Sequence, residues 1–266
     1  MWDYYNADTE SEESEARNDF YEEEVLESIP EDPEEMIYAC RYKRCQNNYW
    51  CNFDVTPPQL DWSNTISSSN YAPDLPSGVT IKIVANPRLI ERALDDLWES
   101  SSDKVFALDC EWRPSFKKGE RNPVALLTIA STTHAVLIRL CRMRFRDGVL
   151  PDNLIHFFHE KHATFLGTGW TSDSSALEYS FGTPRETWDD LVDIQDVSRE
   201  FNPNMRVNLR KMVQHYLGFN PPKGSQVTLG DWEAQWLSDA QINYAVLDAL
   251  YVGEIFREMR STHIGR

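Results

Sequence analysis

The sequence lacks any run of roughly 18 apolar residues, the length that a helix needs to cross a lipid bilayer. It also lacks a basic N-terminus, because its first residues, MWDYYNADTE, carry acids where a secretory or mitochondrial leader carries arginine or lysine. Both absences argue against a membrane protein and against a secreted one. We therefore expect an intracellular protein, in the cytoplasm, the nucleus or both.

Cysteine is scarce, with five in 266 residues, and an odd number cannot all pair with one another. Cys110 and Cys141 lie in apolar, strand-like surroundings. Such surroundings suit buried, reduced thiols better than a disulfide framework.

The other cysteines, Cys40, Cys45 and Cys51, lie close together among basic and aromatic residues. A closed zinc site needs four ligands, and the first histidine of the chain is His134, so a ligand is missing nearby. Zinc binding therefore stays open beside two alternatives. The segment could dock on the folded body through its aromatic residues, or contact single-stranded nucleic acid.

Basic residues are almost absent from the first 35 positions, where Arg17 stands against 15 acids. Self-repulsion and few aliphatic residues predict a disordered acidic tail, which is either solvated or docks on a protein partner. The net charge of −17 comes mainly from the N-terminal part, because residues 76–266 hold 25 acidic and 22 basic side chains. This nearly neutral remainder is compatible with a locally contacted nucleic acid.

Three regions follow from composition: a disordered acidic tail at 1–35, a cysteine and aromatic segment with a linker at 36–77, and a folded body at 78–266. Apolar periodicity in the body predicts strands at 79–87, 105–112, 124–131, 134–140, 164–170 and 192–197. It predicts helices at 88–100, 150–163, 171–182, 208–219 and from Ser238 to about Arg260, with a loop at 225–232. The strands at 124–131 and 134–140 read as an antiparallel meander, and Ser238 with Gln241 forms a capping box.

The strand VFALDCEW, residues 105–112, places Asp109 and Glu111 on the same side, because side chains repeat every second residue. Two neighbouring acids repel each other and lower β-propensity. A divalent cation would offset that cost. The alternative from this stretch alone is a strand end where both acids reach solvent.

Three further residues stand at positions that favour a site. Asp173 lies near a helix start directly after a buried strand, where the helix dipole stabilises a negative charge. Tyr244 and Asp248 are four residues apart on the C-terminal helix, so they share a face at the edge of its apolar stripe. Each observation alone is ordinary, since an acid at a helix start is usually a cap and a tyrosine beside a core usually packs.

Taken in chain order, the motifs LDCEW, GWTSDSSAL and YAVLD resemble those of the DEDDy 3'-5' exonucleases, the superfamily of RNase D and the Werner-helicase exonuclease domain. The resemblance runs from about Thr80 to Met259, and connecting segments such as NPVALLTIAS and LRKMVQHYLGF share it. The stretch CEWRPSF is most similar to the mutator-type exonucleases linked to RNA silencing. A histidine in place of Tyr244 would indicate the DEDDh branch instead.

The resemblance implies an RNase H-like α/β fold, with a mixed central sheet flanked by helices, and a metal-dependent 3'-5' exonuclease. It implies that Asp109, Glu111, Asp173 and Asp248 hold two Mg²⁺ or Mn²⁺ ions and that Tyr244 orients the attacking water. The expected substrate is single-stranded nucleic acid, with RNA favoured over DNA, and the expected product is a nucleoside 5'-monophosphate. The alternative is a catalytically silent adaptor of the same fold that binds RNA or protein partners. Basic residues that could contact phosphates are scattered along the sequence of the body: Lys117, Lys118, Arg121, Arg210, Lys211 and Lys223.

Overall fold

The computed structural model describes residues 58–67, 73–143, 145, 148–160, 162–203, 207–222 and 225–264. All of them fall within one compact unit of the chain, Arg44–Arg266. The predicted acidic tail, the segment with Cys40, Cys45 and Cys51, and Lys223 lie outside the described residues. The predictions for them, and the domain boundaries at 35 and 77, stay predictions.

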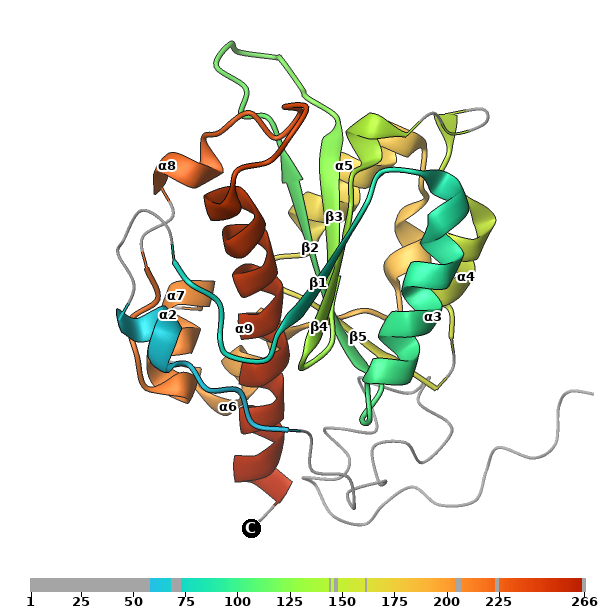
Figure 1. The fold of residues 1–266 in the computed structure, drawn as a ribbon. Helices are drawn as coiled ribbons and strands as arrows, with labels where there is room; N and C mark the ends of the chain where they lie inside the picture. Colours follow the sequence, from blue (N-terminus) through green and yellow to red (C-terminus); the bar gives the residue numbers. More distant parts are fainter. Residues whose placement is uncertain are drawn as a thin grey trace, which may run out of the picture. The chain divides into compact units, whose positions relative to one another are not determined.

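A six-stranded mixed sheet forms the centre of the fold (Figure 1). The strand order is β1-β4-β3-β2-β5-β6, with β1 at Thr80–Val84, β2 at Val105–Trp112, β3 at Val124–Ala130, β4 at His134–Ile138, β5 at Thr164–Gly167 and β6 at Val192–Asp193. Strand β3 is antiparallel to β2 and β4, and the other neighbours are parallel. The meander and the mixed α/β architecture are thereby confirmed.

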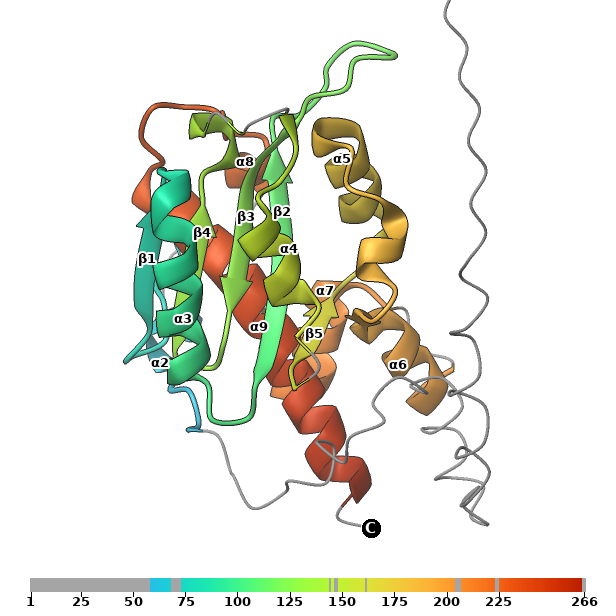
Figure 2. The ribbon, with the colours of Figure 1, turned by 90° about the vertical axis from the view of Figure 1, so that its right-hand side faces the viewer.

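Helices cover both faces of this sheet. Helices α3 (Ile90–Ser100) and α4 (Asp152–Phe158) lie on one face, and α9 (Asp239–Ile264) crosses the other (Figures 1 and 2). The other helical elements are α2 (Ser63–Ser67), η2 (Pro87–Leu89), η3 (Leu140–Arg142), α5 (Thr171–Phe181), η5 (Arg185–Trp188), α6 (Ile194–Phe201), α7 (Leu209–Met212), the π-helix η6 (Val213–Leu217) and α8 (Ser225–Thr228). Within the part of the chain that the structure describes, no helix has both the length and the hydropathy for a membrane crossing.

Helix α9 crosses β2 at Gly253, next to Ala107. A Cβ atom at Gly253 would lie 3.9 Å from the Cβ atom of Ala107 and 2.8 Å from Nη1 of Arg257. The second distance is shorter than real contacts allow, so the guanidinium occupies the space that a methyl group would need. This crossing brings the side chains of α9 to those of the central strand.

The chain after β5 corrects two predictions of strands. Strand β5 ends at Gly167 rather than 170, because the backbone turns at Gly169, whose φ is +62°. The strand predicted at 192–197 is only Val192–Asp193 long, and α6 begins at Ile194. The carboxylate of Asp193 accepts a hydrogen bond from Gln195 N at 2.9 Å, an N-cap that starts a helix where β-branched residues had indicated a strand.

Three helical predictions also need correction. Helix α4 ends at Phe158, before the predicted end at 163. The helix predicted at 208–219 is α for one turn only and continues as a π-helix, which ends at Gly218 with a φ of +78°. The predicted loop at 225–232 contains the short helix α8.

The described part of the predicted linker packs against α9. Trp62 stacks on Tyr251 with ring centroids 5.3 Å apart, and Phe219 lies 5.5 Å from Trp62. Asn243 Nδ2 donates to the Pro73 carbonyl at 2.9 Å. This segment therefore covers one flank of the helix that carries Tyr244 and Asp248.

Candidate active site

The strand β2 supplies the first two acids of the site. Asp109 and Glu111 alternate with Cys110, which is buried in the hydrophobic core on the opposite side. The register against β3 shifts between Glu111 and Trp112, so the strand is irregular directly after the second acid. The acid pair thus lies at the end of the strand that opens towards a loop.

Helix α9 supplies the next two residues. Its start is fixed by the predicted capping box: Ser238 N donates to Gln241 Oε1 at 3.1 Å, and Gln241 N donates to Ser238 Oγ at 3.3 Å. Tyr244 and Asp248 follow one turn apart, and the Tyr244 hydroxyl donates a hydrogen bond to the Asp248 carboxylate. The cap therefore determines which helical face these two side chains share.

Three carboxylates converge between β2 and α9. Oxygens of Asp109, Glu111 and Asp248 all lie within 4.8 Å of one another. The three residues are partly exposed, yet Asp109 Oδ2 is enclosed and finds no hydrogen-bond partner among the described residues. An enclosed carboxylate oxygen without a donor is costly unless something positive reaches it.

Asp173 reaches the same place from α5. It lies in the first turn of that helix and is 8% exposed. The set of three within 4.8 Å does not include it. Burial raises its pKa to about 7, although the backbone N–H groups of Cys110 and of Asp173 itself lower it in part. The involvement of Cys110 places the Asp173 carboxylate beside β2, between the two strand acids.

The electrostatics of the group show mutual repulsion. Burial, and after it the charges of Glu111, Asp248 and Asp173, raise the pKa of Asp109 well above that of an ordinary aspartate. Burial and the charges of Asp248 and Asp173 do the same for Glu111. Burial raises the pKa of Asp248 to about 6, against the hydrogen bond from Tyr244 that lowers it. Negative charge at this place is therefore poorly compensated by the protein itself.

The donor set fits divalent cations. No ion pair among the described residues joins a lysine or arginine to these four carboxylates. Carboxylate oxygens are the hard ligands that Mg²⁺ prefers, and the unpartnered Asp109 Oδ2 is an oxygen that such an ion could satisfy. The residues present thus fit the metal centre that the motifs predict.

Asp193 is a supporting residue that the sequence reasoning missed. Its two carboxylate oxygens accept hydrogen bonds from Gly169 N at 3.1 Å and Trp170 N at 2.9 Å, in addition to the cap on α6. It therefore holds the turn that leads into Asp173. The available signal is that Asp193 directly precedes the residues of α6, as an N-cap does, but the β-branched residues at 192–197 predict a strand there.

A second support lies beneath Tyr244. The ring of Trp232 is fully buried, with its centroid 6.3 Å from that of Tyr244, and its Nε1 donates to the Thr228 carbonyl at 3.3 Å. The buried Arg139 donates to the Ala234 carbonyl at 2.6 Å. These contacts hold the loop before α9 on the body.

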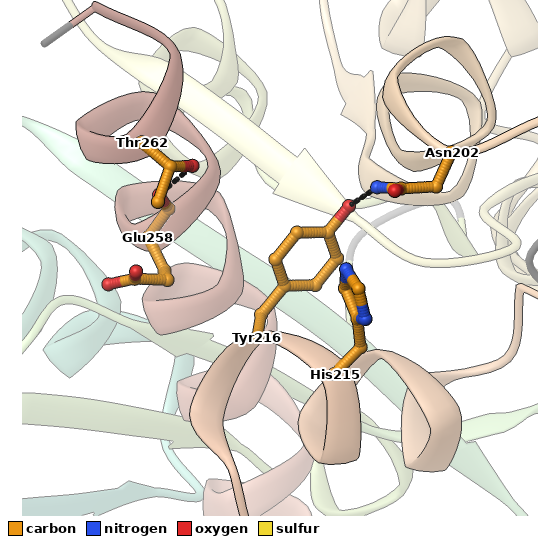
Figure 3. Close-up of a pocket in the computed structure, with 5 residues that line it drawn as sticks. All are labelled: Asn202, His215, Tyr216, Glu258 and Thr262. Atoms are coloured by element: carbon orange, nitrogen blue, oxygen red, sulfur yellow. Dashed lines mark hydrogen bonds between the residues drawn. The ribbon is translucent and has the colours of Figure 1, made fainter.

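One surface hollow lies away from the acids (Figure 3). It has a volume of about 240 Å³ and is lined by Asn202, His215, Tyr216, Glu258 and Thr262. Glu258 is ten residues beyond Asp248 on α9, roughly 15 Å along the helix axis. None of the five predicted site residues lines this hollow, so it is distinct from the carboxylate group.

Similarity to known proteins agrees with this geometry. Residues 82–263 match the 3'-5' exonuclease family. A 3'-5' exonuclease of Arabidopsis thaliana is 26% identical over 171 residues, which cover 64% of this chain and 57% of that protein. The match thus spans little more than half the length of this relative.

Two solved structures share the fold. The EXO domain of Aedes aegypti Nibbler superposes with a TM-score of 0.58 at 20% identity, over 79% of this chain and 94% of that one. Escherichia coli RNase D, an exoribonuclease involved in structured RNA processing, gives a TM-score of 0.55 at 16% identity, over 70% and 46%. They confirm the RNase H-like α/β fold. Because the family match extends over most of the sequence, the chain belongs to the 3'-5' exonuclease family.

Proposed function

We propose that this protein is a metal-dependent 3'-5' exonuclease that shortens single-stranded nucleic acid from its 3' end, favours RNA over DNA and releases nucleoside 5'-monophosphates. One observation carries the proposal: the carboxylates of Asp109, Glu111 and Asp248 lie within 4.8 Å of one another, without a cationic side chain paired to them among the described residues. Family membership supplies the type of reaction.

Asp109, Glu111, Asp173 and Asp248 would hold two Mg²⁺ or Mn²⁺ ions. When bound, two such ions stabilise the charge on the attacking and leaving oxygens of a phosphodiester displacement. Asp109 is the best candidate for a shared ligand, since its pKa responds, after burial, to all three of the other acids. The carboxylates must be ionised to bind cations, so bound ions would also offset their mutual repulsion.

Tyr244 would orient the attacking water rather than deprotonate it. Burial, followed by the nearby acids, raises the pKa of its phenol far above the ordinary value, so the hydroxyl keeps its proton at neutral pH. That proton is directed to Asp248, which leaves the phenol oxygen free to accept a hydrogen bond from water. A fixed acceptor at this place selects one orientation of the nucleophile.

The preference for RNA rests on likeness alone. The RNase D of similar fold is an exoribonuclease. A protein partner for the acidic tail and a location in the cytoplasm or nucleus are further expectations of the same kind.

The test is shortening of labelled single-stranded RNA and of the matching DNA by the full chain, with Mg²⁺ or Mn²⁺ and with EDTA. We expect stepwise products from the 3' end and faster shortening of RNA. Asp109→Asn should slow the reaction by about 10²- to 10³-fold, as the loss of one preorganised electrostatic group does elsewhere. If no substrate is shortened, or if the variant shortens it equally well, the chain is a silent adaptor instead.

A further inference from the structure

The loop between β2 and β3, residues 113–122 and here called the arm, protrudes from the sheet at the end where β2 finishes (Figures 1 and 2). It begins two residues after Glu111. Tyr179 of α5 donates through its hydroxyl to the Arg121 carbonyl at 3.3 Å, and Ser180 accepts from Val124 N at 2.8 Å. The arm is therefore attached to both the strand with Glu111 and the helix with Asp173.

Internal hydrogen bonds give the arm a defined shape. The Asn122 side chain donates to the carbonyls of Arg113 at 3.0 Å and Pro114 at 3.3 Å. At the tip, Glu120 N donates to the Lys117 carbonyl at 3.1 Å, and Gly119 has a φ of +84°. A hydrogen-bonded turn with positive φ at its third residue is of type II and suits glycine there. Side chains on this loop are thus presented in fixed directions.

The exposed side chains of the arm include one aromatic residue, several cations and one acid, Glu120, whose carboxylate accepts hydrogen bonds from Phe116 N and Lys117 N at 3.3 Å. Phe116 is 78% exposed, the highest value for a large apolar side chain among the described residues after that of Trp236. Arg113, Lys117 and Lys118 are exposed as well, and none of them forms an ion pair with a carboxylate of a described residue. The Arg121 guanidinium lies 4.9 Å from the centroid of the Tyr179 ring. Three of the basic residues that could contact phosphates, Lys117, Lys118 and Arg121, thus lie on the same loop as Phe116, and Arg121 lies beside the ring of Tyr179.

The loop before α9, which forms a second rim beside Tyr244 through Trp232, has the other charge. The loop before α9 also exposes an aromatic residue, Trp236, at 81%. However, it carries Asp231 and Glu233 and no basic residue between 229 and 238. A polyanion approaching the carboxylates is therefore attracted at the arm and repelled at this second rim.

We propose that the arm, with Tyr179, binds the nucleotides that precede the 3' end of a single-stranded substrate: Phe116 stacks on a base, and Lys117 and Lys118 contact phosphates. The inference rests on the proposed exonuclease function and names where its substrate strand lies. Aromatic side chains interleaved with cations are the usual means of holding single strands without sequence preference. An acidic protein segment would also suit the charge, but it would not require stacking on Phe116.

Binding can be measured apart from hydrolysis by fluorescence anisotropy, with labelled oligouridylate and the full chain carrying Asp109→Asn. We expect Phe116→Leu to weaken binding about tenfold, because it keeps apolar surface and loses the stacking face, and Phe116→Trp to restore it. Lys117→Ala with Lys118→Ala should reduce the slope of log affinity against log salt by about 1.4, since each phosphate contact on a single strand contributes about 0.7. The arm variants should also lose most of the gain in affinity from a dinucleotide to a longer oligomer.

The matched control removes two lysine or arginine charges elsewhere, as Arg210→Ala with Lys211→Ala on α7, where both residues are exposed. We expect this control to change the salt slope less than the arm variant does. Equal slopes in the two double variants, or unchanged affinity in Phe116→Leu, would overturn the inference. A third result would also overturn it: a polyglutamate peptide displaces the oligouridylate, and the Phe116→Leu variant binds the peptide and the oligouridylate as tightly as its parent does.

The two proposals fail separately. If the arm variants lose affinity but the unmodified chain shortens no substrate, the arm binds nucleic acid and the exonuclease function is wrong. If the unmodified chain shortens RNA and the arm variants bind it as tightly as their parent, the function holds and the placement of the strand is wrong.

Discussion

Two groups of buried acids lie between the same two elements, and they differ in one respect. The first group lies near the start of β2, where Asp103 meets Glu254 and Arg257 of α9. Arg257 is paired with both acids: its Nε is 2.8 Å from Asp103 and its Nη1 is 3.0 Å from Glu254. Near the end of β2, Asp109 and its neighbours have no such guanidinium among the residues that the structure describes.

The pKa values record this difference. Burial alone would raise the pKa of Asp103, but the charge of Arg257 and its hydrogen bonds outweigh burial and lower the pKa below the ordinary value. At the other end, burial and like charges raise the pKa of Asp109 together. The charge of Arg257 thus outweighs burial at Asp103, whereas burial still outweighs it at Glu254, whose pKa is raised. At Asp109 no cation of the described residues opposes burial. The first group has its cation within the fold, and the second group is the one that we propose to bind a cation from solution.

We expect the largest effect on the free energy of unfolding when the first group loses its cation. Replacing Arg257 by methionine leaves Asp103 as a buried, uncompensated charge, for which we expect a loss of about 3–5 kcal/mol in the free energy of unfolding. Urea denaturation measures it. The double variant Arg257→Met with Asp103→Asn should regain a large part of that loss, and a double variant no more stable than the single one would contradict the pairing.

Added Mg²⁺ should give the second group a compensating positive charge, as Arg257 gives the first, and should thereby stabilise the protein. At a concentration 100 times its dissociation constant, an ion that binds only the folded state raises the free energy of unfolding by about 2.7 kcal/mol. Thermal or urea denaturation with Mg²⁺ and with EDTA gives the difference. Asp109→Asn should lose most of this gain, and Arg257→Met should keep it. An undiminished gain in Asp109→Asn would place the ion elsewhere.

The smallest effect is on the pH dependence of the metal-free protein. The pKa of Asp173 is raised to about 7 and that of Asp248 to about 6, so the folded state binds more protons than the unfolded one between the ordinary aspartate value and about pH 7. The free energy of unfolding should therefore fall as pH rises through this window, by at most about 1.4 kcal/mol per pH unit for each group.

Asp103 contributes with the opposite sign. Because its pKa is lowered, its stabilisation is present above the ordinary aspartate value and is lost only as the pH falls below it. Urea titrations in EDTA from about pH 5 to about pH 7 should thus report the carboxylates with raised pKa values, which are those of the second group together with Glu254. The double variant Asp173→Asn with Asp248→Asn should flatten the curve, and an unchanged curve would assign the dependence to other residues.

Local patterns in the sequence predict the parts of the site that depend on local geometry. The period of a strand puts Asp109 and Glu111 on one side, and the spacing of a helix puts Tyr244 and Asp248 on one face. The capping box at Ser238 formed as predicted, since it needs only residues three apart. That these pairs meet followed from the resemblance to a family, because no local pattern encodes a contact between β2 and α9.

The failures have physical causes of the same kind. At 192–197, β-branched residues favour a strand, but Asp193 caps a helix that begins at Ile194. The Asp193 carboxylate also accepts hydrogen bonds from Gly169 N and Trp170 N, which are distant in the sequence. The pair of Arg257 and Asp103 joins residues 154 positions apart and leaves no local trace. The sequence does not show the attachment of the arm to α5 either, because the hydrogen bond from Tyr179 to the Arg121 carbonyl joins residues 58 positions apart.

The absent side chain at Gly253 leaves room for the guanidinium that serves the first acid group. A Cβ atom there would lie 2.8 Å from Arg257 Nη1 but at an ordinary contact distance of 3.9 Å from the Cβ atom of Ala107. An added methyl group would therefore displace the end of the arginine side chain, whose Nη1 is paired with Glu254, rather than separate α9 from β2. The glycine thus serves the ion pairs of Arg257, and the packing of α9 on β2 does not depend on it.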